Sequence, residues 1–94
     1  MFLARVSREL VRDNRTSVNF LFVDDRVIRR YNRRYLRHDW VTDVLAFPMK
    51  SNGVLGDVMI SAETARRQAR ERGHPFEKEL KILSLHGLLN LIRS

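Results

Sequence analysis

The segment from Phe76 to about Ile92, which has a helical pattern, constrains the fold more than any other segment of the sequence. Glu77 and Glu79 fall in its first turn and Pro75 precedes it, as is common at the start of a helix. Its second half is apolar in every direction on a 3.6-residue period. We therefore expect a central, buried helix around which the other elements pack.

The segments before this helix alternate between patterns typical of strands and of helices. The expected strands are 17–23, 44–47 and 54–60, and the expected helices are 2–11, 24–35, 61–72 and 76–92. Asp24 and Ser61 can cap the helices that follow them, and Gly73 can end the second of these. Pro48 should end the second strand, which is expected to pair antiparallel with the third. This order predicts an α+β domain in which a small mixed sheet of about three strands packs against about four helices.

The length of 94 residues supports one domain with a modest core. No apolar run reaches the roughly 18 residues that a transmembrane helix needs, and the stretch before Arg5 is too short for the apolar part of a signal peptide. We therefore expect a cytoplasmic protein without a membrane partner. The sequence contains no cysteine, which leaves histidine, aspartate and glutamate as candidate metal ligands.

Positive charge is carried mainly by arginine and is concentrated in one stretch. Lysine and arginine number 18 against 11 aspartate and glutamate residues, which gives a formal charge of +7. On a helical period, six arginines fall within an arc of roughly 140°. They are Arg26, Arg29, Arg30, Arg33, Arg34 and Arg37. Guanidinium groups match phosphate geometry, so this face favours RNA or another polyanion, with an ordinary solvated helix face as the alternative.

The same predicted helix carries an apolar stripe of Val27, Ile28, Tyr31 and Tyr35. We expect both tyrosines to face the core, because they are in phase with the two aliphatic residues. Their interleaving with arginines leaves stacking on nucleic-acid bases as the alternative.

The ionisable residues of the last helix leave two interpretations open. His86 suits either a hydrogen-bonded core or cleft histidine or a metal ligand. Glu79 stands seven residues earlier on nearly the same face, where it either lines the same cleft or complements the helix N-terminus. His38 and His74 fall in predicted turns.

Three stretches carry a further pattern, in order along the chain. They are Asn32-x-x-Tyr35 followed by Asp39-x-x-Thr42-Asp43-Val44-Leu45-Ala46-Phe47-Pro48, then Leu55-Gly56-Asp57-Val58-x-Ile60-Ser61, and then Glu79-Leu80 leading to His86-Gly87-Leu88-Leu89-Asn90-Leu91. The combination resembles the YbeY family of bacterial rRNA maturation factors. These proteins are described as metal-dependent, single-strand-specific endoribonucleases.

The resemblance implies a zinc site of three histidines, two of them four residues apart on one helical face and the third after a glycine turn. His86 matches the first position and is the expected catalytic and metal-binding residue. Asn90 occupies the second position, and none of the 94 residues matches the third. The arginine that follows the tyrosine in the family is Leu36 here, with Arg37 one residue later. We therefore expect a zinc-dependent hydrolase in which metal binding and activity are impaired.

The resemblance also implies a YbeY-like endoribonuclease in rRNA processing and ribosome maturation, which hydrolyses phosphodiesters with metal-activated water. The expected partners are RNA, held by the six arginines, and the ribosomal subunit or ribosomal proteins. Residues 1–94 would form a single YbeY-like domain that lacks the C-terminal part of the family domain. Two alternatives stay open: a non-catalytic RNA- or ribosome-binding module, and a truncated fragment that self-associates through an exposed C-terminal helix.

Overall fold

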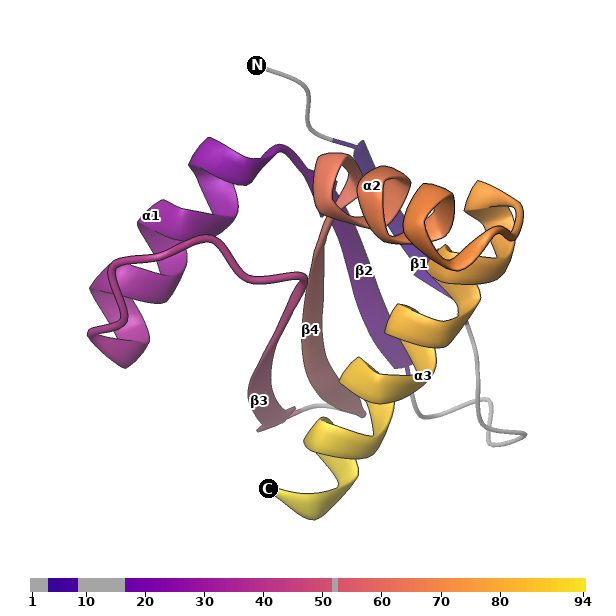
Figure 1. Ribbon diagram of the computed structural model, residues 1–94. Coiled ribbons are helices and arrows are strands. Elements are labelled where there is room, and N and C mark those ends of the chain that lie inside the picture. Colours follow the sequence, from indigo (N-terminus) through magenta and orange to yellow (C-terminus); the bar gives the residue numbers. More distant parts are fainter. Residues whose placement is uncertain (1–3, 9–16, 52) are drawn as a thin grey trace.

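A mixed four-stranded sheet lies between helices in the computed structural model, which describes residues 4–8, 17–51 and 53–94 (Figure 1). The strands are β1 (Ala4–Arg8), β2 (Ser17–Val23), β3 (Val44–Ser51) and β4 (Val54–Ser61), in the order β1-β2-β4-β3. The helices are α1 (Asp25–Leu36), α2 (Ala62–Arg72) and α3 (Phe76–Arg93). The predicted α+β class is confirmed.

β4 lies between β2 and β3 in the sheet and pairs with both of them. β2 pairs parallel with β4, in a register that places Phe20 opposite Val58. β3 pairs antiparallel with β4, as predicted from the short loop between them. β3 continues past Pro48 instead of ending before it. Proline is tolerated there because β3 is an edge strand, where one side of the backbone has no strand to bond.

The prediction of a helix at 2–11 is wrong for its described part. Ala4–Arg8 is a strand that pairs antiparallel with β2, from Ala4 opposite Phe22 to Arg8 opposite Val18. This stretch also alternates apolar and polar residues with a period of two. Pairing with the backbone of β2 therefore prevails over the helical spacing. The other apolar residues of that pattern lie outside the described residues.

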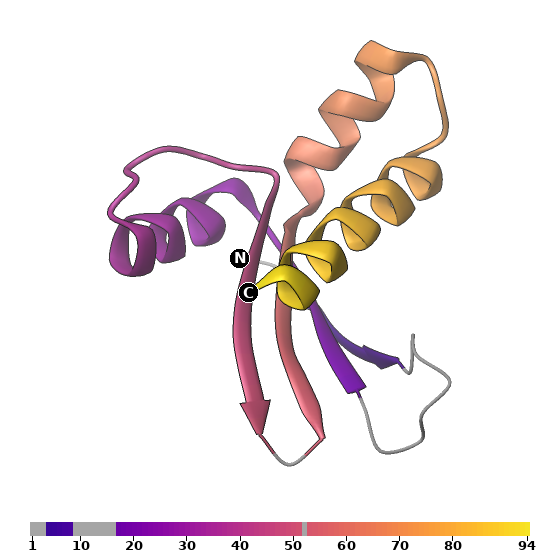
Figure 2. The same cartoon turned by 90° about the horizontal axis from the view of Figure 1, so that it is seen from below.

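Two cores form because alternate strand residues point to opposite sides of the sheet. On one side, Val58 and Ile60 pack with Leu83 and Leu91 of α3 and with Ala65 of α2. The core on the other side joins α1 to the sheet and consists of Val23, Val27, Ile28, Leu45 and Met59. Figure 2 shows α1 on one side of the strands and α2 and α3 on the other.

The helix ends agree with the expected capping residues. The Asp24 carboxylate accepts a hydrogen bond from the Val27 amide at 2.9 Å, and the Ser61 hydroxyl accepts one from the Thr64 amide at 3.2 Å. α2 ends at Gly73 in the left-handed conformation, with φ of 68°. None of the helices in the described ranges is long and apolar enough to cross a bilayer.

The sequence predicted that α3 would be buried on all sides. In the structure it is buried along one stripe only. The stripe consists of Glu79, Leu83, Gly87 and Leu91, at steps of four. A Cβ added at Gly87 would lie 2.3 Å from Cγ1 of Val58, so only glycine lets α3 cross the sheet this closely. Apolar residues on the other side are exposed, namely Leu85, Leu89 and Ile92.

Candidate nucleic-acid interface

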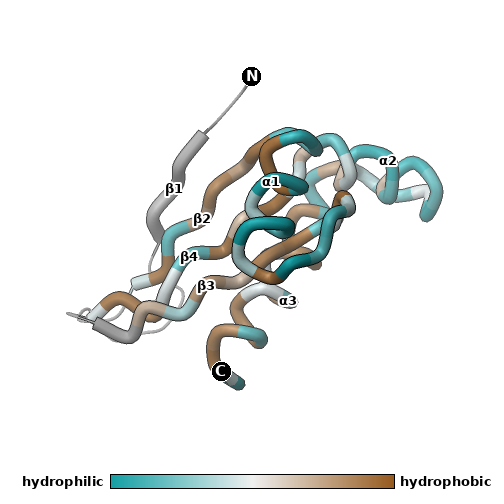
Figure 3. The backbone as a smooth tube through the Cα atoms, turned by 90° about the vertical axis from the view of Figure 1, so that its left-hand side faces the viewer, coloured by the Kyte–Doolittle hydropathy of each residue, from teal (hydrophilic) through white to brown (hydrophobic). Residues whose placement is uncertain are grey.

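The arginine ridge is the exposed face of α1 and its C-terminal cap. Val27, Ile28 and Asn32 turn toward the core, which leaves the arginines of the helix in solvent. All six ridge members are exposed, and they are Arg26, Arg29, Arg30, Arg33, Arg34 and Arg37. The side view in Figure 3 shows the hydrophilic stretches of α1 beside the apolar strands. The predicted basic face is therefore present.

A shallow hollow of about 310 Å³ lies on this ridge. It is lined by Arg26, Arg29, Arg30 and Arg33, together with Asp39 from the segment after the helix. The Nε of Arg29 donates a hydrogen bond to Asp39 Oδ1 at 3.0 Å. That bond, with the charges of Arg29 and Arg33, holds the pKa of the exposed Asp39 carboxyl below its ordinary value. Asp39 is therefore ionised near neutral pH and offsets part of the charge of Arg29.

The segment after α1 is held against the helix by its backbone. Arg37 adopts the left-handed conformation, with φ of 58°, and its amide donates to the Arg33 carbonyl at 3.1 Å. The His38 amide donates to the carbonyl of Asn32 at 3.2 Å. The side-chain amide of the buried Asn32 donates in turn to the carbonyl of Trp40 at 3.0 Å. These bonds fix the path of residues 37–40 beside the ridge.

The prediction that Tyr31 and Tyr35 face the core is wrong. Their exposed fractions are 37% and 55%, and their rings stack on one another at 5.8 Å between centroids. The Tyr35 ring also meets Phe47 of β3 edge-on at 5.6 Å. Both rings lie against Phe47 of β3, and the helix slants away from the sheet toward its C-terminal end (Figure 1). The tyrosines therefore reach no further than the edge strand.

The chain's three histidines occupy three different settings. His86 is exposed on α3, and Asn90 is exposed one turn later. The His38 ring stacks on Trp40, with centroids 4.5 Å apart. His74 lies in the turn between α2 and α3, where its Nε2 is 2.6 Å from Glu79 Oε1.

Glu79 is fully buried, which neither interpretation of the sequence anticipated. Its second carboxylate oxygen accepts a hydrogen bond from Arg72 at 2.7 Å, so one buried acid joins the end of α2 to the start of α3. Glu79 and His86 do not line a common cleft, because Glu79 is buried in the protein and His86 is exposed to solvent. One signal was present in the sequence: Glu79 is in phase with Leu83, Gly87 and Leu91.

Asp25 joins the starts of α1 and α2. Its Oδ1 accepts hydrogen bonds from the hydroxyls of Ser61 and Thr64, and its Oδ2 lies 2.9 Å from Arg67. Burial alone would raise the pKa of this carboxyl. The bonds from Ser61, Thr64 and Arg67, together with the Arg67 charge, outweigh burial and hold the pKa below its ordinary value of 3.8.

We therefore expect stability to fall in acid partly through Asp25. Because its pKa is lower in the folded state, the contribution is complete above pH 3.8 and is lost as the pH drops through the folded value. Urea unfolding between pH 3 and pH 6 should show a smaller acid loss for Asp25→Asn than for the unmodified chain. Glu71→Gln, at an exposed carboxylate of α2, serves as the control, and equal acid losses in all three proteins would contradict the assignment.

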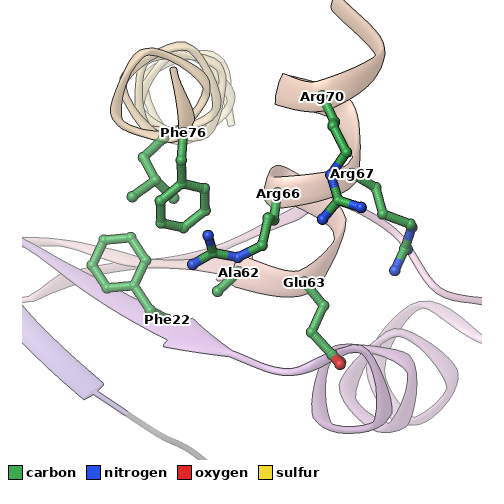
Figure 4. Close-up of a pocket in the computed structure, with 8 residues that line it drawn as sticks. Phe22, Ala62, Glu63, Arg66, Arg67, Arg70 and Phe76 are labelled. Carbon is green, nitrogen blue, oxygen red and sulfur yellow. The ribbon is translucent and has the colours of Figure 1, made fainter. Parts of the chain in front are cut away.

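Another hollow, of about 680 Å³, lies between α2, α3 and β2. Figure 4 shows Arg66 extending between Phe22 and Phe76, and its guanidinium carbon is 4.3 Å from the centroid of the Phe76 ring. Neither His86 nor any member of the arginine ridge lines this hollow. It is therefore separate from the predicted site residues.

Comparison with known proteins places this geometry in a family. The family model described as Endoribonuclease YbeY matches residues 2–92. The chain belongs to the YbeY family. An Endoribonuclease YbeY from Syntrophotalea carbinolica is 42% identical over 100 residues, which cover 96% of this chain and 67% of the relative. One from Aquifex aeolicus is 45% identical, with 84% of this chain and 55% of the relative covered.

A solved structure also resembles this chain. The solution structure of a Thermotoga maritima protein matches with a TM-score of 0.62 and 35% sequence identity, over 79% of this chain and 49% of that protein. The chain thus spans between about half and two thirds of the length of the proteins that it matches.

The zinc site that the YbeY resemblance implies does not fit the side chains described. Within residues 4–8, 17–51 and 53–94, no three histidine, aspartate or glutamate side chains are grouped so that they could hold a metal ion. His86 has Asn90 one turn away, and an amide oxygen is a poor ligand for zinc. Leu36, at the position of the YbeY arginine, is exposed at the end of α1. These residues alone therefore lack the three protein ligands of a catalytic zinc.

Proposed function

We propose that this chain binds RNA as a YbeY-type endoribonuclease of rRNA processing and ribosome maturation whose own hydrolytic activity is impaired, with the arginine ridge holding the phosphate backbone. The observation that carries the proposal is the exposure of six arginines on one side of a chain that matches Endoribonuclease YbeY. The arginines of α1 span about 12 Å from Arg26 to Arg34, at 1.5 Å per residue. The ribosomal subunit or ribosomal proteins would be further partners, in the cytoplasm.

The ridge suits RNA binding for two physical reasons. Guanidinium groups donate paired hydrogen bonds to phosphate oxygens, and each contact releases counterions from the nucleic acid. Adjacent like charges on α1 also repel one another, and a bound polyanion relieves that repulsion. The direct test is the salt dependence of binding to a single-stranded RNA. Binding that does not weaken as salt rises, or no binding at all, would contradict the proposal.

Hydrolysis in our proposal needs more metal ligands than the described residues supply. We therefore expect the 94-residue chain to bind zinc at well below one equivalent. RNase activity should be weak or absent, and His86→Ala should leave RNA affinity within about twofold, because one exposed histidine contributes little. Elemental analysis checks the zinc content, an RNA cleavage assay checks the activity, and an RNA-binding titration checks the affinity of His86→Ala. One equivalent of zinc, with cleavage abolished by His86→Ala, would show that the site is complete. A non-catalytic RNA- or ribosome-binding module is the alternative function.

The exposed apolar side of α3 supports self-association as a second proposal. Leu85 and Ile92 each expose more than half of their surface, and burying such a side chain yields about 1.5–3 kcal/mol. Light scattering across concentrations should show a rising mass for the unmodified chain. Leu85→Glu with Ile92→Glu should weaken association at least tenfold, whereas Leu36→Glu on α1 should not. A monomer at every concentration would contradict this proposal.

A further inference from the structure

An exposed aromatic pair stands beside the arginine ridge, on the segment that follows α1. The rings of His38 and Trp40 stack with centroids 4.5 Å apart and planes 11° from parallel. Trp40 nevertheless exposes 57% of its surface. The pair therefore presents a flat aromatic surface to solvent, whereas a large aromatic side chain contributes most to stability when it is buried.

The backbone of His38 and Trp40, and not their rings, is hydrogen-bonded to the rest of the described chain. The carbonyl of Trp40 accepts a hydrogen bond from the buried Asn32, and the amide of His38 donates to the carbonyl of Asn32. Asp39, between the two rings in sequence, is bonded to Arg29. The segment is thus tied to α1 at three successive residues. The Trp40 side chain is left available for a ligand at little cost in ordering.

The charges around the pair indicate what kind of ligand it could receive. Asp39 lines the hollow on the arginine ridge, and Trp40 is the next residue along the chain. A phosphate held by these arginines would therefore lie beside Asp39, which is one residue along the chain from the exposed indole. An aromatic ring next to a row of cations is the combination that binds single-stranded nucleic acids, in which the bases stack on the ring while arginines follow the backbone.

We propose that Trp40, backed by His38, is a nucleobase-stacking site of the RNA interface. This inference rests on the proposed function, since it adds a base contact to the phosphate contacts of the ridge. The phosphate contacts supply affinity for any polyanion, whereas the indole interacts only with a ligand that carries a planar base. Trp40 would thus make the surface prefer RNA with unpaired bases over a polyanion of equal charge.

The chain contains one tryptophan, so fluorescence excited at wavelengths that tyrosine does not absorb reports on Trp40 alone. The test titrates the full chain with a single-stranded RNA 12-mer and, separately, with inorganic polyphosphate of matched charge. RNA should quench the fluorescence along the same curve as an independent binding measurement, and polyphosphate should not. Trp40→Leu should weaken RNA binding about 5- to 100-fold with an unchanged salt slope, because stacking involves no counterion release.

Two further variants keep the result interpretable. Trp40→Phe retains a ring and should recover most of the affinity, while Met49→Ala, at a similarly exposed apolar residue of β3, should leave it unchanged. RNA binding that depends on salt but neither quenches Trp40 nor responds to Trp40→Leu would overturn the stacking site and leave the proposed function standing. Equal quenching by polyphosphate would also overturn it. The absence of any RNA binding would overturn both.

Discussion

Replacing Arg29, Arg30, Arg33 and Arg34 together by glutamine is expected to weaken RNA binding on the order of a hundredfold near 0.1 M salt. Each lost phosphate contact lowers the slope of log affinity against log salt by about 0.7 for a single strand, so four contacts change it by about 3. Fluorescence anisotropy of a labelled single-stranded RNA at several salt concentrations measures both quantities.

The matched control removes four positive charges from the other side of the sheet. Arg66, Arg70, Lys78 and Lys81 are exposed on α2 and α3, and replacing them by glutamine gives the same net charge as the ridge variant. If the ridge binds RNA, the control retains most of its affinity and slope. Equal losses in the two variants would show that net charge, and not the geometry of α1, is responsible.

Removing Arg72 and His74 together is expected to lower the free energy of unfolding by about 3–5 kcal/mol. Alanine at both positions leaves the carboxylate of Glu79 buried without the two partners that now bond it at 2.7 and 2.6 Å. An unpaired buried charge is costly, whereas an apolar side chain of similar size at the same place is often neutral. Adding Glu79→Leu to the double variant should therefore restore most of the lost stability.

Urea unfolding at pH 7 separates these cases. The double variant should unfold at much lower urea than the unmodified chain, and the triple variant should approach the latter. Arg70→Ala with Lys78→Ala, at exposed positions on the same two helices, controls for the loss of surface charge. A double variant within about 1 kcal/mol of the unmodified chain would show that the Glu79 bonds contribute little.

Local signals in the sequence predicted the middle of the chain well. The capping roles of Asp24 and Ser61, the left-handed Gly73 and the antiparallel β3–β4 pair depend on neighbouring residues, and the structure contains all of them. The arginine face was also predictable, because a helical period alone brings its members to one side of α1.

The errors arise where distant contacts decide the outcome. The helical spacing near the N-terminus gave no indication that β2 offers a free edge to Ala4–Arg8. Tyr31 has the phase of a core residue, but its ring packs against Phe47 of the edge strand and the residue is 37% exposed. The partners of Glu79 come from the preceding turn, whose path depends on how α2 and α3 pack. The Trp40 stack is likewise set by Asn32, eight residues earlier.

The position of β4 between β2 and β3 has a consequence for synthesis on the ribosome. β2 and β3 leave the ribosome before β4, yet they do not pair with one another and are joined in the sheet only through β4. The pairing of Ser17 with Val54 closes a loop over residues 18–53, which contains all of α1. α1 packs on Met59 of β4, so the arginine ridge can take its final orientation only after that strand has emerged. A nascent chain halted before residue 54 would therefore carry the ridge arginines without the sheet that orders them.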